Sequence, residues 1–375
     1  MKNLIIRLAS ILFGIFLALL MLELILQFLP VSNPPNNVQI SPSNPIYVKE
    51  PNKDFIYSRG RFFEVMAKKH SNNYGFINRQ DYLTNASSPL LAIIGDSFVE
   101  AFQVNDGSTM TDRLQEKVGK NGRIYSFGFG GNQLPMYLAY AQYAQQQFHP
   151  EGMVFVIVGN DYDLSISKFD NKPNYYFFFP QEDGKMIWKF NPYRLGINDR
   201  LLRYSALYRY LKNNIDGFMI IENLRGKINN IINPDKNSEQ PVNQFDANTS
   251  IDTNPERVDL SKRGVEEFLR LLPEMTGLPA NRILFLVLGR NSFEELNSDM
   301  DQLTYIDIMH EYFLKKAQEE GYETIDIQTV LSEHHKKYNQ PFTFTTDAHW
   351  NELGHQLAAE QIEKSHLFLE LFQGH

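Results

Sequence analysis

Short apolar runs alternate with stretches of helical periodicity along most of this chain, and no other feature limits its possible folds so strongly. The apolar runs occupy residues 90–94, 123–127, 154–158, 283–288 and 324–327. The helical stretches occupy residues 108–118, 135–148 and approximately 301–320. Strands that are apolar on both faces are typical of parallel sheets covered by helices, so the pattern predicts an α/β fold with a parallel sheet. Sites in such folds lie at the carboxyl ends of the strands.

The N-terminal region predicts a membrane-spanning helix. Residues 8–22 carry no charge, and Glu23 is the only charged residue before Leu29. At 1.5 Å per residue, the segment 8–29 spans about 33 Å, which matches the hydrocarbon core of a bilayer. The alternative is a cleaved signal peptide, but its apolar core would be unusually long, and no small-x-small cleavage site occurs near residues 30–33.

The charges around this segment predict its orientation. Lys2 and Arg7 precede it, and no Lys or Arg follows before Lys49. The positive-inside rule therefore predicts a single-pass protein with a cytoplasmic N-terminus, whose remaining residues, including the folded domain, are extracytoplasmic. Through this helix the membrane is an expected partner of the chain.

The rest of the chain is predicted to form one domain behind a spacer. Residues 31–45 are rich in Pro, Asn and Ser, which is typical of an extended linker. The predicted division is an anchor at residues 1–30, a linker and lead-in at 31–72, and a domain at 73–375 with an insertion at about 165–255.

The insertion interrupts the strand–helix alternation with mixed structure. Its aromatic run at residues 175–180 is predicted to pair with residues 185–190 as a hairpin. Residues 200–213 and 217–230 have helical patterns, and the polar residues 234–255 predict a mobile loop. The aromatic side chains are expected to pack on the core, although they could alternatively stack on sugars.

Composition limits the possible partners and cofactors. The formal net charge is -8, and residues 334–337 form only a short basic run, which argues against a nucleic-acid partner. The absence of cysteine excludes disulfides, zinc-thiolate sites, iron–sulfur clusters and a cysteine nucleophile. A metal site built from His334, His335, Asp347 and His349 is disfavoured because neighbouring histidines usually point apart. We expect neither a metal nor an organic cofactor.

A serine follows the first apolar run, in the sequence Gly95-Asp96-Ser97-Phe98. A serine at a tight strand-to-helix turn presents its hydroxyl at the carboxyl edge of the sheet, and its backbone N–H faces the same space. Taken alone, the tripeptide Gly-Asp-Ser is also common in ordinary turns.

The second and third apolar runs end in segments that can donate hydrogen bonds. Residues 128–132 (Gly-Phe-Gly-Gly-Asn) would let the backbone approach a ligand closely, although a plain loop is the alternative. Residues 159–161 (Gly-Asn-Asp) place the amide of Asn160 where it can donate to a developing oxyanion. The alternative for this segment is a helix cap or a turn.

A histidine and a carboxylate lie close together near the C-terminus, in residues 346–351 (Thr-Asp-Ala-His-Trp-Asn). His349 can act as a general base, and Asp347 can orient its ring if the segment is extended, because residues i and i+2 then point the same way. Alternatively, Asp347 caps the helix expected near Asn351, and His349 is a surface residue.

Together these segments resemble the four sequence blocks of the SGNH/GDSL hydrolase superfamily, in the same order and with similar spacing. The matching residues are Gly95-Asp96-Ser97, the glycines ending at Gly131, Gly159-Asn160-Asp161, and Asp347 with His349. Asn73-Tyr74-Gly75-Phe76 also resembles the lead-in of membrane-anchored members. The resemblance covers residues 73–165 and 260–365.

The resemblance implies a flavodoxin-like three-layer α/β/α domain that cleaves or transfers ester-linked acyl groups. It implies that Ser97 is the nucleophile, His349 the base and Asp347 the residue that orients the base. The backbone N–H groups of Ser97 and Gly131 and the amide of Asn160 would form the oxyanion hole. No cofactor is implied.

The chain departs from the superfamily pattern at two positions. The last block is usually Asp-x-x-His, which would place the acid at Thr346, whereas here Asp347 lies two residues before His349. The position that is often glycine after Gly-Asp-Ser-Phe-x-x is Ala101.

Three functions remain open from the sequence. The favoured one is a membrane-anchored serine esterase that hydrolyses acyl esters, with acetyl the expected group and an extracytoplasmic glycan the expected substrate. The same residues could instead transfer the acyl group to a glycan hydroxyl as an O-acyltransferase. The third is a non-catalytic glycan-binding or assembly protein that keeps the fold.

Overall fold

The computed structural model describes residues 2–38, 40–41, 44–191, 202, 204–215, 253–290 and 303–373. The chain divides into two compact units. The smaller unit contains residues 1–34, 55–68 and 194–241, and the larger contains residues 35–54, 69–193 and 242–375. The domain boundaries stated above remain a prediction.

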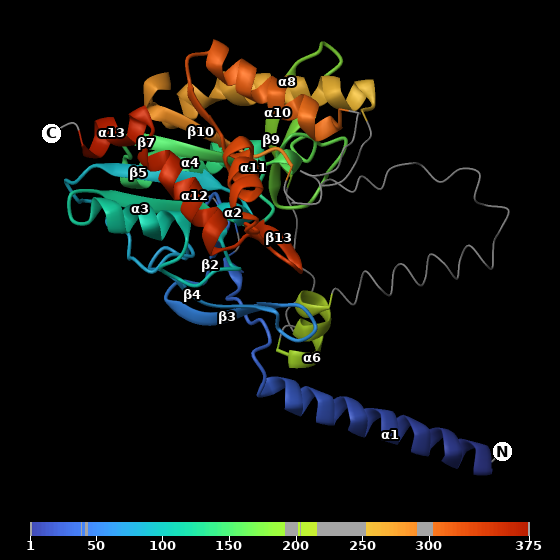
Figure 1. Cartoon of the computed structure of the whole chain (residues 1–375). Helices are drawn as coiled ribbons and strands as arrows, with labels where there is room; N and C mark the ends of the chain where they lie inside the picture. The colour runs from blue at the N-terminus through green and yellow to red at the C-terminus, as the bar shows by residue number, and fades with distance from the viewer. Residues whose placement is uncertain are drawn as a thin grey trace. The chain divides into compact units, whose positions relative to one another are not determined.

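The larger unit is built on a parallel five-stranded sheet (Figure 1). Its strands are β5 (Leu90–Gly95), β6 (Arg123–Gly128), β7 (Gly152–Ile157), β10 (Ile283–Val287) and β11 (Glu323–Asp326). Their spatial order is β11-β10-β7-β5-β6, and each neighbouring pair is parallel. Numbered along the chain, this is the order 2-1-3-4-5 of flavodoxin-like folds. The predicted fold class and all five predicted strands are confirmed.

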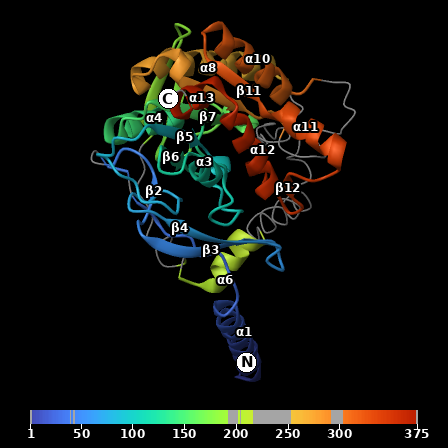
Figure 2. The same cartoon turned by 60° about the vertical axis from the view of Figure 1, so that its left-hand side comes forward.

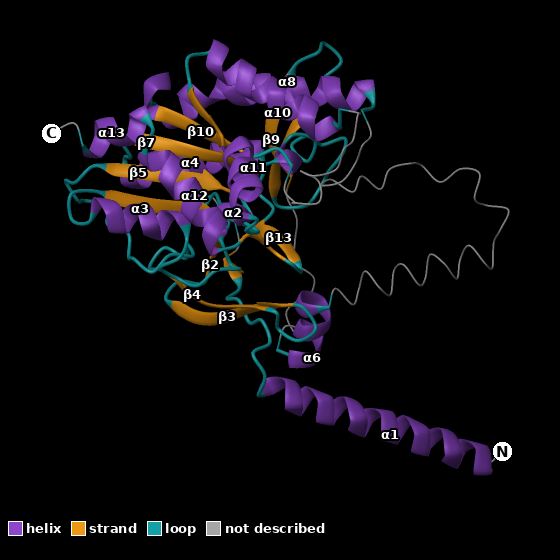
Figure 3. Cartoon of the chain, viewed as in Figure 1, coloured by secondary structure: helices purple, strands orange, loops and turns teal. Residues whose placement is uncertain are grey.

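Helices cover both faces of this sheet, which gives three layers (Figure 1, Figure 2, Figure 3). One face packs against α4 (Leu134–Phe148), α8 (Pro255–Thr276) and α10 (Tyr305–Glu319). The other face packs against α2 (Ser97–Glu100), α3 (Met110–Val118), α11 (Ile327–Tyr338), α12 (Glu352–Glu363) and α13 (His366–Phe372). In β5, Ala92 and Ile94 face the first set, and Leu91 and Ile93 face the second. Both faces are buried, which is why the strands appear as continuous apolar runs.

Among the described residues, short strands form four further pairs outside this sheet. They are β1 (Asn37–Val38) with β2 (Val48–Lys49), β3 (Lys53–Arg59) with β4 (Val65–Ser71), β8 (Tyr175–Pro180) with β9 (Met186–Asn191), and β12 (Thr343–Phe344) with β13 (Asp347–Trp350). The predicted hairpin of the insertion is therefore confirmed. Its Phe177 and Phe178 are buried, and the Trp188 indole donates to the Pro135 carbonyl at 2.9 Å, so these aromatic side chains pack on the core.

The smaller unit contains α1 (Lys2–Gln27), the tip of the β3–β4 hairpin and α6 (Ala206–Arg209), which continues into a π-helical turn at Tyr210–Asn214. By length and apolar composition α1 could cross a membrane, and a signal sequence would pass the same test. The helix predicted at residues 200–213 is present in its described part, although it is shorter. The helix predicted at 217–230 lies outside the described residues, as does nearly all of the loop predicted at 234–255.

Candidate active site

Ser97 lies at the carboxyl end of strand β5, between β7 and β6 in the sheet, where a tight turn leads into α2. Asp96 caps this helix and accepts a hydrogen bond from the Phe98 N–H at 2.9 Å. A Cβ on Gly95 would lie 2.4 Å from a methyl group of Val99, so only glycine fits the turn. Ala101 ends the helix with φ 52°, in the left-handed region that favours glycine. The serine hydroxyl is therefore placed at the sheet edge by local geometry.

His349 and Asp347 meet this serine from a segment about 250 residues away in sequence. The His349 Nε2 lies 2.7 Å from the Ser97 Oγ, and its Nδ1 is hydrogen-bonded to an Asp347 carboxylate oxygen. The same oxygen accepts the His349 backbone N–H at 3.0 Å. The Asp347 side chain is 2% exposed and that of His349 is 28% exposed, so the carboxylate is shielded while the imidazole reaches solvent.

The strand β13 explains why these two side chains point the same way. Asp347 and His349 are alternate residues of this extended segment, as the sequence analysis expected. The helix that follows is capped by Asn351, whose side chain accepts from the N–H groups of Leu353 and Gly354. Asp347 is therefore not the helix cap.

The glycine segment after β6 lies against Ser97. A Cβ on Gly130 would lie 3.7 Å from the Ser97 Cβ. The Gly130 N–H donates to a Glu100 carboxylate oxygen at 2.8 Å, so this group is occupied. Gly131 has φ +83°, and its N–H meets no acceptor among the described residues. Of the two glycines, Gly131 is thus the one whose N–H can donate a hydrogen bond to a substrate oxygen.

Asn160 lies in the turn after β7, on the other side of β5 from the glycine segment. The strand order β6-β5-β7 places the segments that contain Gly131, Ser97 and Asn160 in a row along one sheet edge. The Asn160 side chain is half-buried and forms no hydrogen bond within the described part of the chain. Asp161 holds this turn, because its carboxylate accepts the Val158 N–H at 2.8 Å.

Sequence reasoning missed Glu100, which is buried beside the glycine segment. Its second carboxylate oxygen lies 3.7 Å from the Lys49 ammonium, which also sits 4.6 Å from the centre of the Phe129 ring. Burial raises the pKa of Glu100, and Lys49 and the Gly130 N–H partly oppose this shift. No sequence signal pairs Glu100 with Lys49, because Lys49 lies in the predicted linker.

The second histidine of the C-terminal segment has a structural role. His355 is buried, and its Nδ1 accepts the Met110 N–H at 3.4 Å. Burial lowers the pKa of His355 to about 3, so its ring is neutral at ordinary pH. It is not part of the Ser97 cluster, the hydrogen-bonded group of Ser97, His349 and Asp347.

Two buried carboxyl groups lie beneath the cluster. Burial raises the pKa of Asp96 to about 6, although the Phe98 N–H and His349 favour its ionised form. Burial and the neighbouring Asp96 raise the pKa of Asp161 well above its usual range, and Tyr137 donates to Asp161 at 2.9 Å. Each ionised carboxylate here disfavours ionisation of the other.

The raised pKa of Asp96 predicts how stability depends on pH. The native group binds its proton more tightly than the unfolded group, whose pKa is near 3.8, so the free energy of unfolding falls as pH rises from about 4 to 6. We expect Asp96→Asn to be more stable than wild type by about 2–3 kcal/mol at pH 8 and to lose this advantage at pH 4. Urea unfolding of both proteins at the two pH values measures the difference. If the free energy of unfolding changes equally with pH in wild type and Asp96→Asn, the prediction is wrong.

Comparisons with known proteins give distant structural likenesses. No protein-family model and no curated protein matches the sequence. The chain is similar to an alpha/beta hydrolase enzyme from the metagenome of Lake Arreo (TM-score 0.38, 14% identity, 78% of this chain and 98% of that chain). It is also similar to an acetyl xylan esterase (TM-score 0.39, 12% identity, 73% of this chain and 97% of that chain). A third similar structure is a lipolytic G-D-S-L family protein from Veillonella parvula DSM 2008 (TM-score 0.37, 13% identity, 74% of this chain and 98% of that chain).

Proposed function

We propose that this chain is a membrane-anchored serine esterase of the SGNH/GDSL type, which hydrolyses acetyl esters on an extracytoplasmic glycan. One observation carries the proposal: the Ser97 Oγ lies 2.7 Å from the His349 Nε2, while Asp347 holds the other ring nitrogen. A hydroxyl, an imidazole and a shielded carboxylate in this arrangement are the parts of a serine hydrolase.

The proposed reaction proceeds through an acyl-enzyme. The Ser97 oxygen attacks the ester carbonyl while His349 accepts the serine proton, and a tetrahedral oxyanion forms. His349 then gives this proton to the leaving alkoxide, the C–O bond of the ester breaks, and the acyl group stays on Ser97. Water attacks this new ester with His349 as base, which releases the carboxylic acid and restores the serine.

The proposed oxyanion hole consists of the Ser97 and Gly131 N–H groups and the Asn160 amide. Two of these donors are unpaired within the described chain, which supports a role toward substrate. Each such donor typically contributes about 3–4 kcal/mol to transition-state stabilisation. Asp347 keeps the His349 ring in the tautomer that can accept the serine proton.

Two tyrosines beside this site support a sugar substrate. The Tyr175 hydroxyl lies 3.4 Å from the position that a Cβ on Gly131 would occupy, and its ring centre lies 5.5 Å from that of Tyr47. Both side chains are half-buried, so each keeps an exposed part. Partly exposed aromatic rings with hydroxyl groups suit the apolar faces and hydroxyls of a pyranose.

Fluorophosphonate labelling of the intact protein in detergent tests the proposal. We expect one adduct, on the peptide that contains Ser97, because an activated serine is the group that this reagent phosphonylates. His349→Gln should lose the labelling and His355→Gln should keep it. An adduct on another serine, or no adduct on folded protein, would contradict the assignment. Product analysis with a glycan acceptor then separates hydrolysis from acyl transfer.

Glu100 is a positioning residue in this proposal, because its carboxylate fixes the glycine segment through the Gly130 N–H. We expect Glu100→Ala to lower kcat about 10- to 100-fold with little change in KM, since the bond to a charged acceptor contributes about 1.5–3 kcal/mol. Glu100→Gln should recover most of the rate, because its amide oxygen can accept the same N–H. Rates are normalised to active sites counted by fluorophosphonate. A purely structural role would lower the number of active sites and leave kcat per site unchanged.

A further inference from the structure

Glu23 is the one charged residue in the apolar part of α1, and the structure shows what it binds. Its carboxylate accepts hydrogen bonds from the Ser205 Oγ at 2.7 Å and from the N–H groups of Ala206 and Leu207 at 2.8 and 2.9 Å. Gln27, one turn further along, also donates to it at 3.0 Å. The anchor helix is thus joined to a segment that lies more than 180 residues later in the chain.

This contact sets the depth at which the hydrocarbon region must end. The segment around Ser205 is not a regular helix throughout, and irregular backbone exposed to lipid tails would leave peptide groups unsatisfied. The polar boundary therefore lies at or before Glu23. Residues 3–22 then span the hydrocarbon core, since 20 residues at 1.5 Å each give about 30 Å, the thickness of that core. This shifts the predicted segment 8–29 toward the N-terminus and places Arg7 near its cytoplasmic end, where a long basic side chain can extend to the headgroups.

The same contact makes the end of α1 part of a folded unit. Leu26 and Val31 form a small buried cluster with Ala206, against which Phe63 and Tyr210 pack. Cleavage of α1 as a signal sequence would remove Leu26 from this cluster and leave Ser205 and its neighbours without their acceptor. The packing favours an uncleaved helix.

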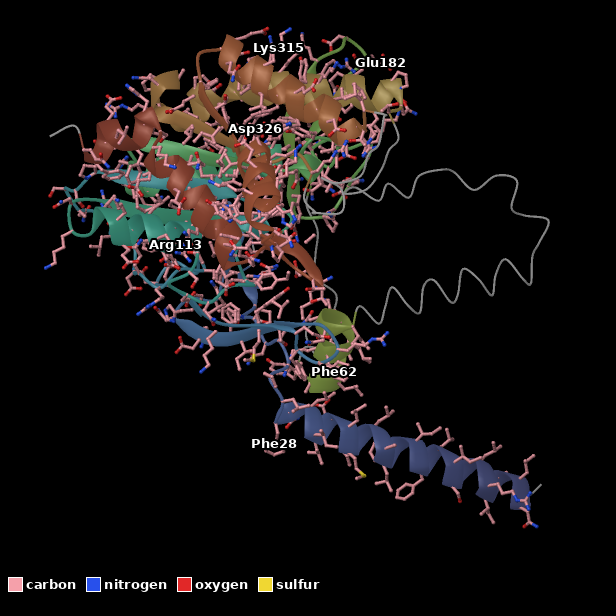
Figure 4. All side chains as sticks on the ribbon, viewed as in Figure 1. Phe28, Phe62, Arg113, Glu182, Lys315 and Asp326 are labelled. Atoms are coloured by element: carbon pink, nitrogen blue, oxygen red, sulfur yellow. The ribbon has the colours of Figure 1, made fainter. Side chains whose placement is uncertain are left out.

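Large apolar side chains of the smaller unit remain exposed next to this boundary (Figure 4). Phe28 is 90% exposed at the end of α1, Phe62 is 84% exposed at the tip of the β3–β4 hairpin, and Tyr204 is 68% exposed just before α6. Outside α1, the described part of this unit carries five basic side chains and one carboxylate, that of Glu64. The basic residues are Arg59, Arg61, Lys68, Arg209 and Lys212.

We infer that residues 28–31, 60–66, 202 and 204–212 form a membrane-facing collar, which lies in the headgroup region of an anionic phospholipid leaflet. Exposed aromatic rings suit this region, and the excess of basic side chains matches the charge of anionic lipids. The occupant is a lipid surface because the collar continues directly from a helix that is suited to the hydrocarbon core. The inference depends on the membrane-anchoring part of the proposed function.

Single-cysteine labelling tests the collar, and the cysteine-free sequence makes each label unique. Phe28→Cys, Phe62→Cys, Tyr204→Cys and Ile15→Cys would each carry an environment-sensitive fluorophore. The full chain is placed in vesicles of phosphatidylethanolamine and phosphatidylglycerol. We expect a lipid with a headgroup spin label to quench positions 28, 62 and 204, and a lipid spin-labelled deep in its acyl chain to quench position 15. Intact mass should show that the extracted protein retains α1.

The possible results separate the collar from the anchor. Quenching at position 15 without quenching at positions 62 and 204 would overturn the collar and leave the anchor in place. No quenching at position 15, or a mass that lacks α1, would overturn anchoring and the collar with it. Glu23→Ala should lower the quenching at position 204 and leave the quenching at position 28 unchanged. Glu23→Gln should retain most of the quenching at position 204. Unchanged quenching at position 204 in Glu23→Ala would overturn the role of Glu23.

Discussion

Replacing Ser97 with alanine is expected to lower kcat/KM for p-nitrophenyl acetate by about ten-thousand-fold or more. The variant keeps the proposed oxyanion donors, but it has no oxygen that can form the acyl-enzyme. The small side chain fits the first turn of α2, since the cap depends on Asp96 and the Phe98 N–H rather than on the serine hydroxyl. Initial rates on the full chain in detergent measure the effect.

Two controls make the Ser97 result decisive. Ser87→Ala removes a hydroxyl from an exposed residue just before β5 and should leave kcat/KM unchanged. Thermal unfolding should show that Ser97→Ala is folded, with a midpoint close to that of wild type. If folded Ser97→Ala hydrolyses the ester as fast as wild type, Ser97 is not the nucleophile and the enzyme proposal fails.

The parallel sheet could be predicted from sequence because its strands are buried on both faces. Ala92 and Ile94 meet one helical layer while Leu91 and Ile93 meet the other, so no polar residue interrupts the run. The helix α8 was missed, although Asn254 and Pro255 form a recognisable start and Gly277 a recognisable end. The polar residues 234–255, which predict a loop, run directly into the start of α8 and obscure it.

The parts of the candidate site that follow strands directly could be predicted from the sheet, and Asp347 with His349 from their spacing of two residues. Ser97 and Gly131 lie after neighbouring parallel strands, so the register of the sheet alone brings their segments together. The contacts of Glu100 with Lys49 and of Glu23 with Ser205 join segments that no periodicity relates. Contacts between such distant segments depend on the complete fold. From sequence, Glu23 is therefore recognisable only as a charged residue in an apolar helix.

Asp347 is the proposed orienting carboxylate, and its replacement tests the departure of this chain from the usual Asp-x-x-His pattern. We expect Asp347→Asn to lower kcat about a thousand- to ten-thousand-fold, because an amide that donates to Nδ1 favours the tautomer whose Nε2 carries the proton. That tautomer cannot accept the Ser97 proton. The side chain is nearly isosteric and buried, so KM and folding should change little.

Thr346→Ala is the matched control, because Thr346 occupies the position where the acid would lie in the usual pattern. The structure leaves Thr346 exposed while Asp347 is buried against His349, so removal of the threonine hydroxyl should not alter the rate. The comparison uses kcat per active site, counted with fluorophosphonate. A large loss in Thr346→Ala together with a small one in Asp347→Asn would mean that another group orients His349. The reverse ranking is expected because a buried carboxylate beside an imidazole stabilises the imidazolium that forms as Ser97 attacks.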